Sequence, residues 1–146
     1  MCLQADVKET AALHRAMKRR KTKRMRFWKQ ARRADVSLCS IYQRTFHWRP
    51  GLNVSDSGCR NIPVKVNREV HRGIHVYREK PTFSASGRIT VAVWCHADDL
   101  IAAGYSDPWR RPSGEAVFTK VHLSPAEYAK AMAADLAHHS HPVRSL

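Results

Sequence analysis

The sequence lacks the features that would place it at a membrane or in an oxidising compartment. No window reaches the ~18–20 consecutive apolar residues of a transmembrane helix, and the N-terminus has no apolar stretch long enough for a signal peptide. The 4 cysteines are scattered without a Cys-x-x-Cys pair, which is typical of reduced thiols rather than of a disulfide scaffold. We therefore expect a cytoplasmic protein without a membrane partner.

The sequence also lacks the short motifs that identify common enzymes and DNA readers. It has no P-loop, no Gly-x-Gly-x-x-Gly and no Ser or Cys nucleophile motif. Neither helix-turn-helix nor zinc-finger spacing is present, so sequence-specific readout of DNA is not indicated. These absences favour binding over catalysis, with no cofactor.

What the sequence does contain is one concentrated block of positive charge. Eleven of the nineteen residues from Arg15 to Arg33 are Lys or Arg and none is acidic, in a chain of net charge +14. The other residues therefore contribute only +3 (14 − 11). Such a block favours a polyanion, and we expect nucleic acid or an acidic host protein as the partner.

Within this basic segment (residues 15–33), Lys and Arg can neutralise phosphates and an interleaved aromatic ring can stack on bases. The residues expected to contact the polyanion are Lys18, Arg19, Arg20, Lys21, Lys23, Arg24, Arg26 and Trp28. In the alternative interpretation, Phe27 and Trp28 point into the core and the cations form a solvated face.

The order of elements predicts an α+β domain. The stretch from Val7 to Lys21 has neither Gly nor Pro and suits a helix that buries Leu13 and Met17. A second helix is expected after Ser124, because Ser-Pro-Ala-Glu combines a capping residue, a first-turn proline and a capping-box glutamate. Its buried stripe would contain Tyr128, Met132 and Leu136.

Between these helices the pattern predicts mainly strands. They are expected over Met25 to Lys29, Ser37 to Trp48, Gly73 to Tyr77, Arg88 to Cys95 (covered on both faces) and Glu115 to Leu123. Other segments are expected to be a charged turn over Ala31 to Asp35, a loop over Gly51 to Asn61 and a short helical turn over Ala97 to Ala103, ended by Gly104. The resulting fold is a mainly antiparallel sheet flanked by an N-terminal and a C-terminal helix. It would form a single domain over residues 1–137, followed by a His-rich tail over residues 138–146.

Several phrases after the basic segment resemble a known family. They are Tyr42-Gln43, Trp48-Arg-Pro-Gly-Leu-Asn-Val-Ser-Asp56, Glu69-Val-His-Arg-Gly-Ile-His-Val-Tyr77, Asp99-Leu-Ile-Ala-Ala-Gly104 and Glu115-Ala-Val-Phe-Thr-Lys-Val121. Together with the opening Met-Cys-Leu, they are similar to a family of small uncharacterised proteins encoded by bacteriophages and prophages. The resemblance implies a phage or prophage origin, and therefore action in a bacterial host cell. Together with the basic segment, it leads us to expect an accessory protein whose partner belongs to a host-defence or nucleic-acid machine. It implies no reaction.

A second hypothesis is enzymatic. Arg44 or His47 on an early strand, Tyr77 on a middle strand and Glu115 at the start of a late strand are loosely similar to the layout of mono-ADP-ribosyltransferases. That resemblance implies NAD held by Arg or His and by Tyr, with Glu115 stabilising an oxocarbenium-like transition state. The Ser-Thr-Ser element and the second glutamate of that layout are absent.

A third hypothesis concerns the polar loop after Trp48. Trp48, Asn53, Ser55 and Asp56 could line a cleft, because polar loops carry function more often than core strands do. The protein would then inhibit or engage a host protein through residues 48–56.

The histidines do not predict a metal site. His71 and His75 have the spacing of paired ligands on a helix, but the segment favours a strand, in which they would lie roughly 13 Å apart. That separation is too large for one ion.

Overall fold

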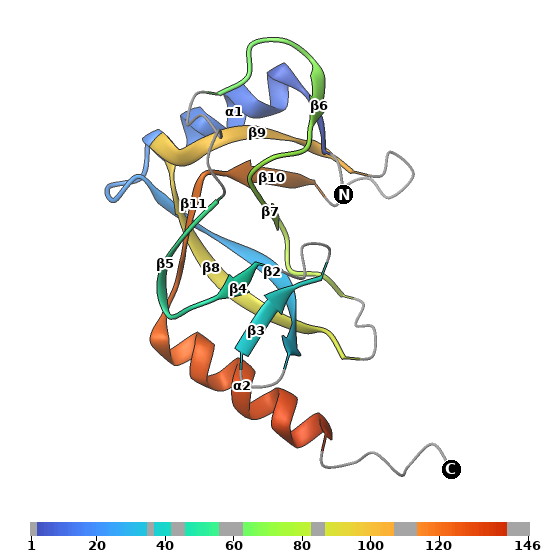
Figure 1. Cartoon of the computed structure of the whole chain (residues 1–146). Coiled ribbons are helices and arrows are strands. Elements are labelled where there is room, and N and C mark those ends of the chain that lie inside the picture. The colour runs from blue at the N-terminus through green and yellow to red at the C-terminus, as the bar shows by residue number, and fades with distance from the viewer. Residues whose placement is uncertain are drawn as a thin grey trace.

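Two helices lie at opposite ends of the molecule, with an antiparallel sheet between them (Figure 1). The computed structural model describes residues 3–34, 37–41, 46–55, 63–82, 87–106 and 114–139, and side chains of the last helix as far as Ala133. The helices are α1 (Val7–Lys18) and α2 (Pro125–His139), with a 3-10 turn at Ala97–Asp99. The strands are β1 (Leu3–Ala5), β2 (Arg24–Ala34), β3 (Ser37–Ser40), β4 (His47–Trp48), β5 (Gly51–Val54), β6 (Arg68–Val70), β7 (Ile74–Tyr77), β8 (Ile89–His96), β9 (Leu100–Tyr105), β10 (Glu115–Phe118) and β11 (Lys120–Leu123). The α+β prediction is confirmed.

The strands follow the order β5-β11-β8-β2-β7-β10-β9-β1-β6, with β3 attached to β2 and β4 to β3. The longest ladder joins β2 to β8, from Arg24 opposite His96 to Ala31 opposite Ile89. On its other edge β2 has two neighbours in succession: β7 pairs with it at Trp28, and β3 pairs with it from Ala31 onward. β7 therefore leaves β2 after Trp28, and β3 takes its place on this edge from Ala31.

The core lies against both faces of the sheet. One cluster includes Leu13 and Met17 of α1 and Ala131 of α2. A second, smaller cluster lies on the opposite face and includes Leu3. The predicted burial of Leu13 and Met17 is confirmed. The predicted cap of α2 is also confirmed, because Glu127 donates its backbone N–H to Ser124 Oγ at 3.1 Å.

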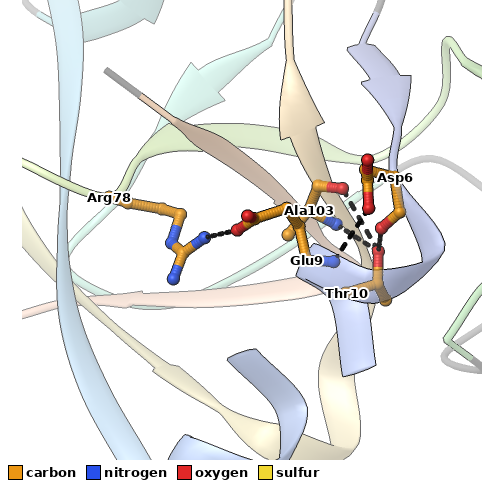
Figure 2. Close-up of polar contacts among 5 residues, drawn as sticks. All are labelled: Asp6, Glu9, Thr10, Arg78 and Ala103. Atoms are coloured by element: carbon orange, nitrogen blue, oxygen red, sulfur yellow. Dashed lines mark hydrogen bonds and ion pairs between the residues drawn. The ribbon is translucent and has the colours of Figure 1, made fainter. Parts of the chain in front are cut away.

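The start of α1 is fixed to the sheet by side-chain hydrogen bonds (Figure 2). Asp6 caps the helix by accepting the Glu9 N–H at 3.0 Å. The buried hydroxyl of Thr10 accepts the Ala103 N–H of β9 at 2.9 Å and donates to the Asp6 carbonyl at 2.8 Å. Arg78, just after β7, donates to the Glu9 carboxylate at 2.9 Å. These contacts hold α1 in a fixed orientation on the sheet, and the basic segment begins at the end of this helix.

Two predicted boundaries around the basic segment were wrong. The helix ends at Lys18 instead of Lys21, because the chain turns there and Lys23 adopts a positive φ of 57°. The turn predicted from Ala31 to Asp35 is strand over its described part. β2 continues to Ala34, because β3 supplies a new pairing partner there.

Two further predictions failed where strand pairing overrides local preference. Gly51–Val54 is strand β5 rather than loop, because it pairs with β11; residues 56–61 of that predicted loop lie outside the described residues. The helical turn predicted to end at Gly104 is instead a 3-10 turn followed by β9. Gly104 lies against β1, where a Cβ atom would approach the Gln4 carbonyl oxygen to 1.9 Å.

The strand predicted from Glu115 to Leu123 is two strands. The chain bends at Thr119, whose N–H donates to the Asp99 carbonyl at 2.9 Å. As a result β10 pairs with β7 and β9, whereas β11 pairs with β5 and β8.

Candidate functional site

The basic segment covers the end of α1, the turn at residues 19–23 and β2. In Figure 1 this turn projects from the body of the molecule between α1 and β2. The exposed cations along it are Arg15, Lys18, Arg19, Arg20, Lys21, Lys23, Arg24, Arg26 and Arg32. Lys18 forms an ion pair with Asp98 at 2.8 Å. Among the described residues, no acidic side chain forms an ion pair with any cation from Arg19 to Arg26. Most of this charge is therefore uncompensated and in water.

Phe27 and Trp28 lie on opposite faces of β2, as adjacent strand residues must. Phe27 is 1% exposed and its ring lies 5.0 Å from that of Phe118 in the core. Trp28 faces outward, with the Arg26 guanidinium 5.3 Å from the centre of its ring. The alternative interpretation placed both rings in the core. It is correct for Phe27 and wrong for Trp28.

The outward side of β2 continues across three further strands. Arg26 lies opposite Trp94 of β8, Trp94 opposite His122 of β11, and His122 opposite Leu52 of β5. Residues directly opposite in antiparallel strands share a face, so these four side chains form one row across the sheet. We call this surface the outer face; its members are Arg24, Arg26, Trp28, Leu52, Val54, Trp94, His96, Lys120 and His122.

Sequence reasoning missed the outer face. It treated β8 as covered on both sides, but only the side with Val91, Val93 and Cys95 is fully buried, whereas Trp94 is 39% exposed. The alternation of side chains along the strand was visible in the sequence. Which side meets water depends on the elements packed against the sheet.

A cavity of about 90 Å³, lined by both polar and apolar side chains, opens beside β2, between β7 and β3. The residues around it are Lys29, Gln30, Ser40, Ile41, Phe46, His71, Gly73, Ile74, His75, Tyr77, Arg88 and Glu115. The Lys29 ammonium donates to the His75 carbonyl at 2.7 Å, near the point where β7 leaves β2. Burial lowers the pKa of Lys29 to about 8, against the opposing effect of the Glu115 carboxylate.

The cavity also shifts the titration of His75. Burial and the nearby Lys29 charge lower the pKa of His75 to about 4. Its Nε2 lies 3.4 Å from the His71 carbonyl oxygen, and its buried Nδ1 has no hydrogen-bond partner among the described residues. His75 is therefore a neutral ring at pH 7.

The structure brings together two of the residues in the enzymatic hypothesis. Tyr77 lies directly opposite Glu115 in the β7–β10 ladder, and both line the cavity. Glu115 is 4% exposed, and its carboxylate accepts hydrogen bonds from the Ser106 N–H, at 3.2 Å, and from the Ser106 hydroxyl. His47 is exposed on β4, with its ring 2.9 Å from Ser37 Oγ, and does not line the cavity. Arg44 lies outside the described residues.

The segment from Trp48 to Ser55 has structural roles. Trp48 is 2% exposed and its indole N–H donates to Ser40 Oγ at 3.2 Å. The side chain of Asn53 is buried and both accepts from and donates to the Arg49 backbone at 2.9 Å, which closes a turn. Ser55 donates its backbone N–H to the Thr119 carbonyl, and Asp56 lies outside the described residues. The large hydrophobic side chains exposed here are Leu52 and Val54, and Arg49 and Pro50 are exposed as well.

Comparisons with protein-family models, with curated proteins and with solved structures gave no match for this chain. Among the described residues, no helix combines the length and apolar content needed to cross a membrane. The candidate function therefore depends on the geometry alone.

Proposed function

We propose that this protein binds nucleic acid through its basic segment. The observation that carries the proposal is the run of exposed cations from Arg19 to Arg26, which forms no ion pair with an acidic side chain of the described residues. Cations held in this way attract phosphates, and the release of counterions from the nucleic acid drives association.

The aromatic ring beside these cations favours nucleic acid over an acidic protein. Trp28 lies on the same face as Arg26, so phosphate contacts and base contacts are available side by side. We further propose that the protein is a phage- or prophage-encoded accessory protein. It would act in the cytoplasm of a bacterial host on a host-defence or nucleic-acid machine.

A triple variant tests the role of the turn. Arg19→Ala, Arg20→Ala and Lys21→Ala together remove three exposed charges. Each lost phosphate contact reduces the slope of log affinity against log salt by about 0.9, so we expect a slope shallower by about 2–3 and a large loss of affinity at low salt. Fluorescence anisotropy with a labelled oligonucleotide measures both quantities.

The matched control removes three exposed cations elsewhere, with Lys65→Ala, Arg68→Ala and Arg72→Ala. It should retain wild-type affinity. A salt-independent affinity for the wild type, or equal losses in the two triple variants, contradicts the proposal. A partner captured from lysate that survives nuclease treatment but dissociates at high salt would instead indicate an acidic host protein.

A second candidate function follows from the cavity. Tyr77 and Glu115 face it together, as the ADP-ribosyltransferase hypothesis requires. That hypothesis expects heat of NAD binding in calorimetry and transfer of label from NAD to a target, lost in Glu115→Gln. The absence of NAD binding would remove it, without affecting the proposal for the basic segment.

A further inference from the structure

The outer face joins exposed aromatic surface to positive charge across four adjacent strands. Trp94 has Arg26 on one side and His122 on the other, in neighbouring strands. Arg24 and His96 face each other two residues further along, and Lys120 of β11 lies opposite Val54 of β5. Adjacent strands are about 4.8 Å apart and alternate residues about 6.6–6.8 Å apart, so the two rows form one continuous platform.

We propose that the outer face is a base-stacking platform for single-stranded nucleic acid, with Trp94 as its central stacking residue. This inference rests on the proposed function, because the basic segment supplies the attraction for the backbone. In this arrangement Arg24, Arg26 and Lys120 contact phosphates, and an unpaired base lies on the Trp94 ring.

The exposure of Trp94 supports a role for this residue in ligand binding. The flanking residues Val93 and Cys95 are 0% and 2% exposed, so β8 is anchored from its other side. Trp94 is 39% exposed. A base that covered its ring would remove apolar surface from water, which favours binding. Trp28 lies diagonally across from Trp94, at a Cα separation of roughly 7–8 Å, and adds a second ring.

Among the residues that the structure describes, the acidic side chains near the platform leave its charge positive. Asp98, in the 3-10 turn after β8, is paired with Lys18 at 2.8 Å and lies 3.7 Å from His96. Asp99 is partly buried, and burial raises the pKa of its carboxyl group. Neither supplies an unpaired exposed carboxylate beside Trp94.

A single strand fits this surface better than a duplex. Bases in a duplex are stacked on one another and show only their edges, whereas an unpaired base can place its flat face on an aromatic side chain. The duplex would still contact the basic segment through its phosphates. The two substrates therefore separate the platform from the basic segment.

The experiment compares Trp94→Ala with the wild type by fluorescence anisotropy. The probes are labelled poly-dT and poly-rU of about 12 nucleotides and a duplex of the same length. We expect Trp94→Ala to weaken single-strand binding by roughly 5- to 100-fold, to leave duplex binding unchanged and to leave the salt slope unchanged. Trp94→Phe should restore most of the affinity, because a phenyl ring can still stack.

Val66→Ala is the matched control, since Val66 is 64% exposed in the bend before β6 and does not belong to the outer face. Thermal unfolding shows whether each variant is folded, and Trp94→Phe keeps the test valid if the alanine variant is not. Unchanged single-strand affinity in Trp94→Ala, or equal losses for single strands and duplex, overturns the platform and leaves the basic-segment proposal standing. A wild type that binds none of the three probes overturns both.

Discussion

Neighbouring cations of β2 lie in opposite environments. Arg24 and Arg26 extend from the outer face into water, whereas Lys29 enters the cavity and donates its ammonium to the His75 carbonyl. An exposed cation keeps its hydration and is available to a polyanion. A buried one loses hydration, and the pKa of Lys29 falls to about 8 as a result. The basic segment thus contains two groups of cations, one exposed to water and one directed into the cavity. A count of Lys and Arg along the chain does not distinguish the two groups.

The largest effect on stability should come from the side of β2 that faces the core. Phe27→Ala removes a ring that is 1% exposed and packs on Phe118, and such deletions cost about 3–5 kcal/mol of unfolding free energy. Trp28→Ala, on the outer face, should cost less. Denaturant unfolding of both variants measures the difference, and equal costs would show that the two faces are not distinct.

Reversing the outer charges should weaken binding strongly without unfolding the protein. Arg24→Glu with Arg26→Glu removes two phosphate contacts and adds repulsion, so we expect nucleic-acid affinity to fall by about 100-fold. Lys29→Met should leave the affinity close to that of the wild type. If Lys29→Met weakens binding as much as the double reversal, the division of the basic segment is wrong.

Lys29 should impose a pH dependence at alkaline pH. The unfolded state binds a proton at Lys29 up to pH 10.5 and the folded state only up to about 8. Between these values the unfolded state holds more protons, so this group makes the free energy of unfolding rise with pH, by about 1–2 kcal/mol. Lys29→Met should lack that rise when unfolding is followed between these pH values. A parallel pH profile for the two proteins would contradict the burial of the ammonium.

His75 should give a smaller effect at acid pH. Its pKa is about 4 in the folded protein against 6.5 when unfolded, so the unfolded state binds the extra proton between these values and acid lowers stability. Because His75 is only partly buried, we expect about 1 kcal/mol by pH 5. His75→Gln should remove this dependence. Lys29→Met should weaken it, since the Lys29 charge contributes to the lowered pKa; an unchanged acid profile in both variants would contradict the assignment.

Local signals predicted the elements whose stability is local. The cap at Ser124 and the stripe of Leu13 and Met17 were readable because a helix depends on residues three or four positions away. The alanine-rich segment after Ala97 was misassigned, because its helical preference loses to pairing with β10 and β1. The bend at Thr119 was missed for the same reason.

The candidate sites show the same division. The concentration of positive charge in the basic segment could be predicted, since nineteen consecutive residues with no acid cannot neutralise one another. The pairing of Tyr77 with Glu115 depends on the register of two strands far apart in the sequence. The row from Arg26 through Trp94 to Leu52 needs three such registers at once.

The amino-acid sequence by itself determined the α+β class, the two helices and the concentration of charge near the N-terminus, because composition and short-range periodicity are properties of the chain. Only the tertiary structure decided which cations meet water and which aromatic ring stays exposed. Alternation along a strand assigns side chains to two faces, but strand pairing and the packing of the core decide which of those faces is buried.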